Sequence, residues 1–203
     1  ARATGKVGVA VATSGPGATN MVTGIATAMM DSSPIVCITG QVGSGLIGSD
    51  AFQETDITGI TLPITKHNYL VAHASDVAPA VREAFAIARS GRPGPVLIDI
   101  TKDAQLGVCE FDWEDAAPDL ASLERVGHSF GVDPIALINA AERPVILAGH
   151  GIILGGGEAA VRAFAEKTQI PVAMTLLGIG SVPASHPLNL GMMGMHGESW
   201  VNT

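Results

Sequence analysis

Hydrophobic residues in the first part of the chain gather in short β-branched runs, separated by polar turns and one Ala-rich stretch. Residues 7–13 form the first run and lead into Ser-Gly-Pro-Gly, which predicts a buried parallel strand followed by a loop. Residues 18–30 are rich in Ala and Met and precede Pro34, so we expect a helix there. A second strand is predicted over residues 34–39 and a short one over residues 66–71.

Helical spacing of apolar residues is clearest over residues 76–90. We expect Asp76 to be the N-cap of this helix and Gly91 to follow its end. Pro95 opens another strand over residues 96–100. Strands that alternate with helices in this way predict a parallel α/β sheet.

Three polar or Gly-rich segments, residues 14–17, 40–54 and 101–103, follow predicted strands. In parallel α/β sheets, ligand groups gather in loops beyond the carboxyl ends of the strands. We therefore expect a functional site where these three loops meet.

The pattern fails from residue 107 to about residue 131, where acidic residues indicate an interdomain connection. A second α/β unit then follows, with a helix that starts at Asp133, a strand over 144–148, a loop over 149–151, a helix over 158–168 and a strand over 171–175. Two strands are fewer than a normal domain sheet contains, so we expect this domain to continue beyond the sequence.

Composition narrows the class of protein. The 203 residues are 47% hydrophobic and carry a net charge of -8 without a Lys/Arg cluster, which argues against a nucleic-acid binder. Neither a membrane-spanning apolar run nor a signal peptide is evident. Cys37 lies in an apolar run and Cys109 in the connection, so we expect no disulfide and a cytoplasmic location. The absence of an initiator Met predicts that the natural chain begins earlier.

Five motifs carry a resemblance to a known family. They are Thr-Ser-Gly-Pro-Gly-Ala-Thr-Asn at 13–20, Thr-Gly-Gln-Val at 39–42 with residues 47–54, Ser-Gly-Arg-Pro-Gly-Pro-Val at 90–96 with residues 99–103, Thr-Leu-Leu-Gly at 175–178, and Gly-Met-Met-Gly-Met-His-Gly at 191–197. In this order and spacing, the chain resembles the acetolactate synthase catalytic subunits, which depend on thiamine diphosphate.

The resemblance implies a domain plan in the α/β class. Residues 1–115 would form a thiamine pyrimidine-binding domain truncated at its N-terminus, residues 116–131 a linker, and residues 132–203 the first part of a central FAD-binding domain. In the family a Glu that activates the cofactor precedes the first of these motifs, and a Gly-Asp-Gly…Asn motif for metal and diphosphate lies in a third domain. Neither has a replacement in this sequence, so we expect no metal ligands here and an inactive chain in isolation.

Two loops have a structural and a functional interpretation. Residues 14–17 suit a tight strand-to-helix turn, and equally a close approach of the backbone to a planar ring. Phe52 is by pattern alone a core residue beneath its loop, whereas an aromatic ring and the Gln53 amide could also line a keto-acid pocket. The resemblance favours a catalytic role for Gln53 and a channel position for Phe52.

Two cations have the same ambiguity. Lys102 could form a solvated pair with Asp103, or, as the resemblance implies, meet pyruvate at the channel mouth. Arg92 could be a surface residue of a helix-to-strand turn, or an anion or ring contact; the resemblance implies contact with FAD. The sequence departs from the family at Thr101 and Gly43, where the family has Pro, which leaves Lys102 in place but puts inhibitor binding in doubt.

The resemblance implies further cofactor contacts in both domains. Gly-His-Gly at 149–151 is weak as a dinucleotide signal by itself, and His196 has no partner ligands at metal-binding spacing. The expected cofactor-binding residues are Gly15, Pro16, Gly17, Asn20, Gln41, Arg92, Gly149, His150, Gly151, Thr175, Leu176, Gly194, Met195, His196 and Gly197.

The implied activity is the condensation of two pyruvates, or of pyruvate with 2-oxobutanoate, with loss of carbon dioxide in branched-chain amino-acid biosynthesis. The implied cofactors are thiamine diphosphate, Mg²⁺ and FAD, and the implied partners are a second catalytic subunit across the active site and a small regulatory subunit. Alternatives are another carboligase of this plan, such as glyoxylate carboligase or sulfoacetaldehyde acetyltransferase, or an inert fold fragment. An incomplete sheet with an open edge also predicts a homo-oligomer.

Overall fold

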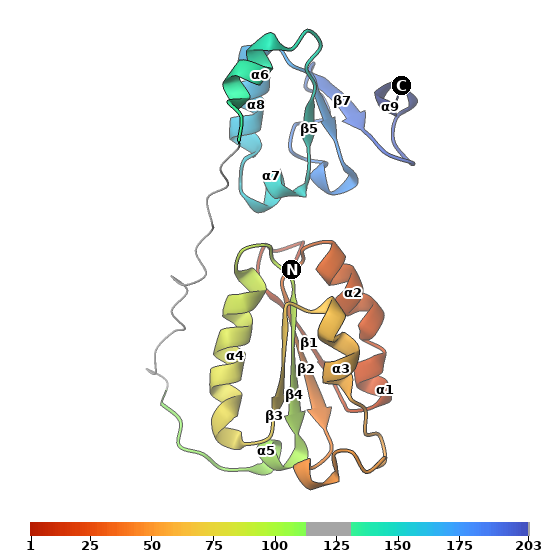
Figure 1. Ribbon diagram of the computed structural model, residues 1–203, viewed down its shortest axis with the longest axis vertical. Coiled ribbons are helices and arrows are strands. Elements are labelled where there is room, and N and C mark those ends of the chain that lie inside the picture. Colours follow the sequence, from red (N-terminus) through yellow and green to blue (C-terminus); the bar gives the residue numbers. More distant parts are fainter. Residues whose placement is uncertain (113–130, 203) are drawn as a thin grey trace. The chain divides into compact units, whose positions relative to one another are not determined.

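The computed structural model describes residues 1–112 and 131–202, which fall in two compact units, Ala1–Gly127 and His128–Thr203 (Figure 1). Both units are α/β, as predicted. The expected linker at 116–131 lies, apart from Gly131, outside the described residues.

The first unit is built on four parallel strands in the order β1-β2-β4-β3. The strands are β1 (Gly8–Ala12), β2 (Ile35–Gln41), β3 (His67–Val71) and β4 (Pro95–Thr101). Each corresponds to a predicted strand. Because all four are parallel, their carboxyl ends lie at one edge of the sheet, where α5 (Lys102–Leu106) follows β4.

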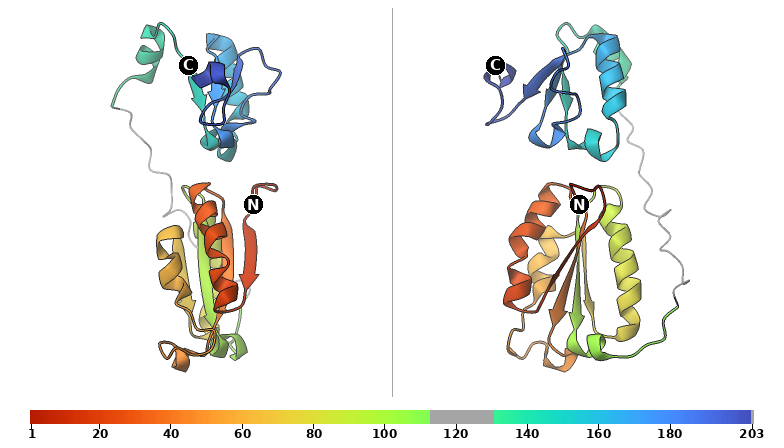
Figure 2. Two further views of the ribbon diagram at one scale, coloured as in Figure 1. Left: turned by 90° about the vertical axis from the view of Figure 1, so that its right-hand side faces the viewer. Right: turned by 180° about the vertical axis from the view of Figure 1, so that it is seen from behind.

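Helices cover both faces of this sheet (Figure 2). The long helix α4 (Ala74–Arg89) packs on one face, and the short helices α1 (Pro16–Thr19), α2 (Val22–Met30) and α3 (Ile57–Thr61) lie on the other. Two 3-10 turns, Ser44–Leu46 and Leu62–Ile64, lie in the connections. The core consists of aliphatic side chains between these layers, and each fully buried Val, Leu or Ile contributes about 1.5–3 kcal/mol.

The central and edge strands differ in burial. All seven residues of β4 are buried, which fits a strand paired on both sides and covered on both faces. The expectation that the first strand is likewise buried is wrong: Val9 and Val11 of β1 are 55% and 73% exposed. β1 is the edge strand of the described sheet, and α4 does not cover the part of β1 at which Val9 and Val11 lie.

Several helix boundaries also differ from the prediction. The expected helix at 18–30 is two helices, because the chain turns at Asn20 and Met21 between α1 and α2. Asp76 is not an N-cap but lies in the first turn of α4, which begins after His73; there its carboxylate still favours the positive end of the helix. The expected loop at 101–103 is the start of a one-turn helix, α5.

The second unit contains a parallel sheet in the order β5-β6-β7. Its elements are α6 (Pro134–Ala140), β5 (Ile146–Ala148), α7 (His150–Leu154), α8 (Glu158–Thr168), β6 (Val172–Met174), a 3-10 turn (Leu176–Gly178), β7 (Asn189–Met192) and α9 (Ser199–Asn202). The expectation of two strands is wrong because β7 adds a third, and the expected loop at 149–151 is mostly helical. A core of Ala148, Ala165, Val172, Met174 and Val182 joins α8 to the sheet.

Within the described ranges, no helix combines the length and apolar character needed to cross a bilayer. Cys37 is buried and Cys109 exposed, and both are free thiols. Burial raises the pKa of the Cys37 thiol to about 11.

We predict that the exposed edge of β1 makes the chain associate. Alternation along the strand directs Val9 and Val11 to the same face as Val7, which packs in the α4-side core, and an open apolar edge strand favours pairing. Light scattering is expected to give a mass above that of the monomer, and Val9→Lys with Val11→Lys to shift it toward the monomer.

Leu62→Lys is the matched control, because Leu62 is 68% exposed but lies outside the sheet. A monomeric unsubstituted chain would contradict this prediction.

Candidate cofactor and substrate site

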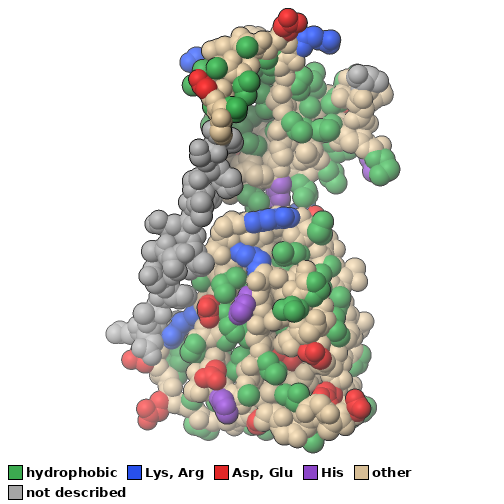
Figure 3. All heavy atoms as spheres, viewed as in Figure 1, with side chains coloured by type: hydrophobic (Ala, Val, Ile, Leu, Met, Phe, Trp, Pro, Cys, Tyr) green, Lys and Arg blue, Asp and Glu red, His purple; other side chains and the backbone are tan. Residues whose placement is uncertain are grey.

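Loops from three strands meet at the carboxyl edge of the first sheet. A Cβ added at Gly40 would lie 3.3 Å from the Gln105 side-chain nitrogen and 3.9 Å from the Ser14 nitrogen. The ends of β1, β2 and β4 are therefore in contact here, as expected for parallel strands. Figure 3 shows several acidic side chains toward the end of this unit at which α5 lies.

Gly15 and Gln53 bring the first two predicted site segments together. Gly15 is buried at φ 59°, and a Cβ there would lie 2.8 Å from the Gln53 carbonyl oxygen. A side chain at this position would thus be strained and would also displace the loop. The backbone of Gln53 occupies the space that the missing side chain leaves, so Gly15 is needed first for packing within the chain.

The loop that carries Gln53 has an unusual backbone, with positive φ at Gly48, Asp50 and Gln53. The Glu54 carboxylate holds it, accepting hydrogen bonds from the backbone nitrogens of Gly48 and of Ala51, the latter at 2.9 Å. These bonds lower the pKa of Glu54. A single carboxylate thereby fixes the strained conformation in which Phe52 and Gln53 are presented.

Phe52 is 88% exposed, so the interpretation of this ring as a core plug is wrong. Gln53 and Lys102 are also exposed, both at the carboxyl edge of the sheet. The backbone nitrogen of Lys102 donates to the Val42 carbonyl at 3.4 Å, which places the start of α5 beside the 40–46 segment. An aromatic ring, an amide and an ammonium group are therefore available at one edge.

Of the two interpretations of Lys102, the solvated pair with Asp103 is not formed. Asp103 instead accepts hydrogen bonds from Ser44, through its hydroxyl and, at 2.8 Å, through its backbone nitrogen. These two bonds hold the pKa of Asp103 well below its usual range. Asp103 fixes the loop after β2 to α5, and the described structure gives the Lys102 ammonium no protein acceptor.

A buried polar network lies directly beneath this edge. Asp99, 1% exposed, accepts hydrogen bonds from the Thr39 hydroxyl at 2.7 Å and from the Gln41 amide at 2.9 Å. Gln41 also donates to the Thr55 carbonyl at 2.7 Å and accepts from the Val42 nitrogen at 2.9 Å. The amide of Gln41 is thus fully used within the chain. Asp99 was missed as a site residue, although a carboxylate within an apolar run was a visible signal.

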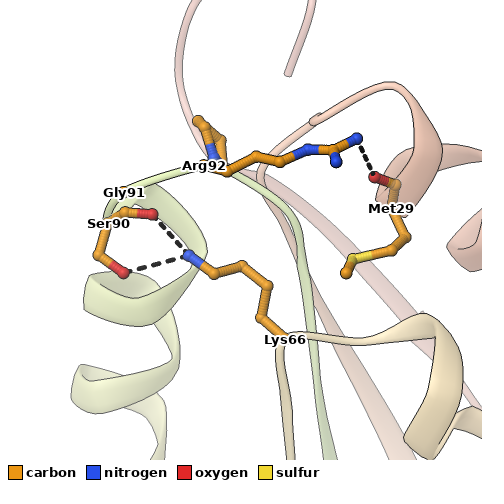
Figure 4. Close-up of a pocket in the computed structure, with 6 residues that line it drawn as sticks. Met29, Lys66, Ser90, Gly91 and Arg92 are labelled. Atoms are coloured by element: carbon orange, nitrogen blue, oxygen red, sulfur yellow. Dashed lines mark hydrogen bonds between the residues drawn. The ribbon is translucent and has the colours of Figure 1, made fainter. Parts of the chain in front are cut away.

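Arg92 lies at the opposite, amino edge of the same sheet (Figure 4). Its guanidinium donates to the Met30 carbonyl at 2.9 Å and to the Ser32 hydroxyl at 2.7 Å, at the end of α2. Lys66 donates to carbonyls of Ile87 and Ser90 at the end of α4. Lys66, Ser90 and Arg92 border a hollow of about 360 Å³, and both cations neutralise helix carboxyl ends. Arg92 is consequently remote from the edge that carries Gln53.

The predicted residues of the second unit meet at the carboxyl edge of its own sheet. The Thr175 nitrogen donates to the Ala148 carbonyl at 3.0 Å, and the Thr175 hydroxyl caps the next turn by accepting from Gly178. A Cβ at Gly178 would lie 2.2 Å from the Ala148 carbonyl oxygen. The expected contacts at Gly149, His150, Gly151, Thr175 and Leu176 therefore adjoin one another.

The 194–197 segment reaches the same edge, since the Met193 nitrogen donates to the Met174 carbonyl at 2.9 Å. Leu176 and Met195 are 69% and 92% exposed, and His196 is exposed as well. Exposed apolar side chains beside Gly-rich backbone suit a flat aromatic ligand. No group of three His, Cys, Asp or Glu that could hold a metal ion occurs among the described residues.

Comparison with known proteins assigns both α/β units to one family. Residues 1–60 match the family model "Thiamine pyrophosphate enzyme, N-terminal TPP binding domain", and residues 133–203 match "Thiamine pyrophosphate enzyme, central domain". The chain belongs to the thiamine pyrophosphate enzymes. The two matches correspond to the two α/β units of this family member.

Comparison with individual proteins shows which thiamine pyrophosphate enzymes this chain is similar to. Over 202 residues, all of this chain, it is 52% identical to the acetolactate synthase isozyme 1 large subunit of Escherichia coli K12. It is also 52% identical over 200 residues to the large subunit of Corynebacterium glutamicum, and 50% identical over 204 residues to that of Lactococcus lactis. The aligned segments are 36%, 32% and 36% of these relatives, so the chain spans about a third of their length.

We predict that Gly15→Ala destabilises the first unit by about 1–3 kcal/mol, because the new Cβ meets the Gln53 backbone at a positive φ. Urea unfolding followed by circular dichroism measures this change. Gly45→Ala is the control, since no atom lies within 4 Å of a Cβ there, and its effect is expected within about 0.5 kcal/mol. Equal stability of the two variants would contradict the close approach.

We also predict the direction of the Glu54 titration. Its folded pKa is lowered by the bonds from Gly48 and Ala51, so its stabilisation of the loop is present above the ordinary pKa of 4.5 and is lost as pH falls through the folded value. The amide proton resonances of Gly48 and Ala51 should titrate with a midpoint below 4.5.

Glu54→Gln keeps the shape of the side chain and should abolish this titration. A midpoint at or above the ordinary value would exclude the role given to the carboxylate.

Proposed function

We propose that this chain is part of the catalytic subunit of an acetolactate synthase. This enzyme condenses pyruvate with a second pyruvate, or with 2-oxobutanoate, and releases carbon dioxide in branched-chain amino-acid biosynthesis in the cytoplasm. The observation that carries the proposal is identity of about half of all positions with acetolactate synthase large subunits along the whole chain. The grouping of Phe52, Gln53 and Lys102 at one sheet edge supports it.

These side chains suit a small 2-keto acid. The Lys102 ammonium, which has no protein acceptor in the described structure, can bind the carboxylate of pyruvate in a charge-assisted hydrogen bond. The Gln53 amide can donate to, or accept from, the reacting groups, and the Phe52 ring can exclude water from them. The strained loop fixed by Glu54 keeps the amide and the ring adjacent, which limits the orientations that the substrate can adopt.

The residues present fit one end of thiamine diphosphate. Pro16 and Asn20 are exposed next to the buried Gly15, and the exposed Phe52 adds a flat apolar face beside them. When bound, the cofactor would act as the electron sink for loss of carbon dioxide. The described residues do not supply a metal cluster, so we assign Mg²⁺ and the diphosphate group to residues outside this chain.

We assign FAD to the carboxyl edge of the second sheet. Support comes from Gly149, Thr175 and Leu176, which lie together at the edge that the segment carrying the exposed Met195 also reaches. Arg92 could contact a ligand with the guanidinium nitrogen that is not bonded to the end of α2. A second catalytic subunit would complete the thiamine site, and a small regulatory subunit would bind elsewhere on the enzyme.

A chimaera tests this function. In it, the chain replaces the aligned 202-residue segment of the Escherichia coli relative. We expect the chimaera to form acetolactate from pyruvate in a colorimetric acetoin assay and the 203-residue chain alone to form none. Lys102→Met is expected to raise the KM for pyruvate roughly tenfold or more, because one charge-assisted hydrogen bond is lost.

Lys167→Met is the matched control, since Lys167 is an exposed lysine in the last turn of α8, which leads into the amino end of β6, whereas the predicted contacts of the second unit lie at the carboxyl edge of its sheet. A folded chimaera that retains flavin but forms no acetolactate would refute the assigned activity. Turnover by the isolated chain would refute the assignment of Mg²⁺ and diphosphate to other residues.

A further inference from the structure

Asp99 lies two residues before the carboxyl end of the buried inner strand β4 and has almost no access to water. It is opposite Thr39 in the β2–β4 register, and one of its oxygens accepts from the Thr39 hydroxyl. The other oxygen accepts from the Gln41 side-chain amide. Both oxygens therefore act as acceptors, which is the pattern of an ionised carboxylate.

The second proton of the Gln41 amide extends this network out of the sheet. It is donated to the Thr55 carbonyl at 2.7 Å. Thr55 directly follows Glu54 and lies two residues from Gln53, so this bond reaches the base of the loop that presents the candidate site.

Other interactions of the loop are internal to it or are packing contacts. The Glu54 carboxylate bonds to backbone nitrogens of the loop itself, residues 48–51, and Gln53 packs on Gly15 without a hydrogen bond. Over the residues that the structure describes, the Gln41–Thr55 bond is the one hydrogen bond that joins residues 47–55 to the strands.

We propose that Asp99 is a positioning residue that orients Gln41 and so fixes the loop of Phe52 and Gln53 to the sheet. That this loop serves a keto-acid site rests on the proposed function, whereas the mechanical link does not. Asp99 touches neither substrate nor cofactor in this role; it sets the place of the residues that do.

The electrostatics of the carboxyl group are consistent with this arrangement. Burial raises the pKa of Asp99, while the bonds from Thr39 and Gln41 lower it, and the nearby Asp56 charge raises it further. The two donors therefore stabilise a charge that burial disfavours. Asp99 in return prevents the Gln41 amide from rotating away from Thr55, since rotation would leave one oxygen of the buried carboxylate without a donor and Thr39 as the remaining partner.

Amide hydrogen exchange on the 203-residue chain tests the link without cofactor or turnover. Asp99→Ala removes the acceptor, and Gln41→Met removes the amide at similar length; both should speed exchange of residues 47–55 roughly tenfold, about the effect of one charge-assisted hydrogen bond. Asp99→Asn keeps an oxygen for Gln41 and can donate to the Thr39 oxygen, so it should restore exchange to near the unsubstituted rate.

Thr39→Val is the matched control, because it removes a bond to the same buried carboxylate but leaves Gln41 untouched. Loop exchange as in the unsubstituted chain is expected there, with peptides of α4 and of the second unit as internal references in every variant. If Thr39→Val frees the loop as much as Asp99→Ala, or if Gln41→Met leaves it protected, the proposal is overturned. An inactive chimaera combined with loop release would refute the proposed function and leave the positioning role standing.

Discussion

Burial of β4 along its whole length is the constraint on which the first unit depends. A strand paired on both sides and covered on both faces must satisfy each polar side chain inside the protein. Asp99 does so through Thr39 and Gln41, and Thr101 does so by capping α5 through the Ala104 nitrogen. Both solutions lie near the carboxyl end of the strand. The requirement to satisfy buried groups thus builds the floor of the candidate site and sets the direction in which Lys102 leaves the sheet.

Rigidity at the same edge comes from backbone positions that ordinary residues rarely adopt. The left-handed conformations of Asp50 and Gln53 would each be unfavourable in isolation, and they persist because Glu54 bonds to the loop and the loop packs on Gly15. Strain is thereby concentrated where Phe52 and Gln53 face solvent. Such a loop presents two side chains in one geometry without support from a covering helix. A binding surface requires this fixed geometry, whereas a simple connection between elements does not.

The regular parts of this architecture were predictable because they repeat. The helix over Glu158–Thr168 was predicted with its observed ends, and β1, β2 and β4 of the first sheet were located from their β-branched runs. Short or irregular parts were not. α5 and α7 are single turns, too brief to show a period, and β7 (Asn189–Met192) contains no β-branched residue. Asp99 was missed although its place in an apolar run was a signal, because the same pattern also occurs where a strand ends, and the contacts with Thr39 and Gln41 that decide between the two are visible in the structure alone.

The direction of the strands separates the predicted contacts of the first unit into two regions, one at each edge of the sheet. Strand direction alone requires that Gln53 and Lys102 share the carboxyl edge of the first sheet, whereas Arg92 precedes β4 and must lie at the amino edge. Its bonds to the end of α2 fix it there, on the far side of a core of fully buried aliphatic side chains. A ligand group that contacts Arg92 therefore lies at the opposite edge of this sheet from Gln53 and Lys102. β4 is the strand that connects the Arg92 turn to Asp99 and Lys102, so it is a direct covalent link between the two edges.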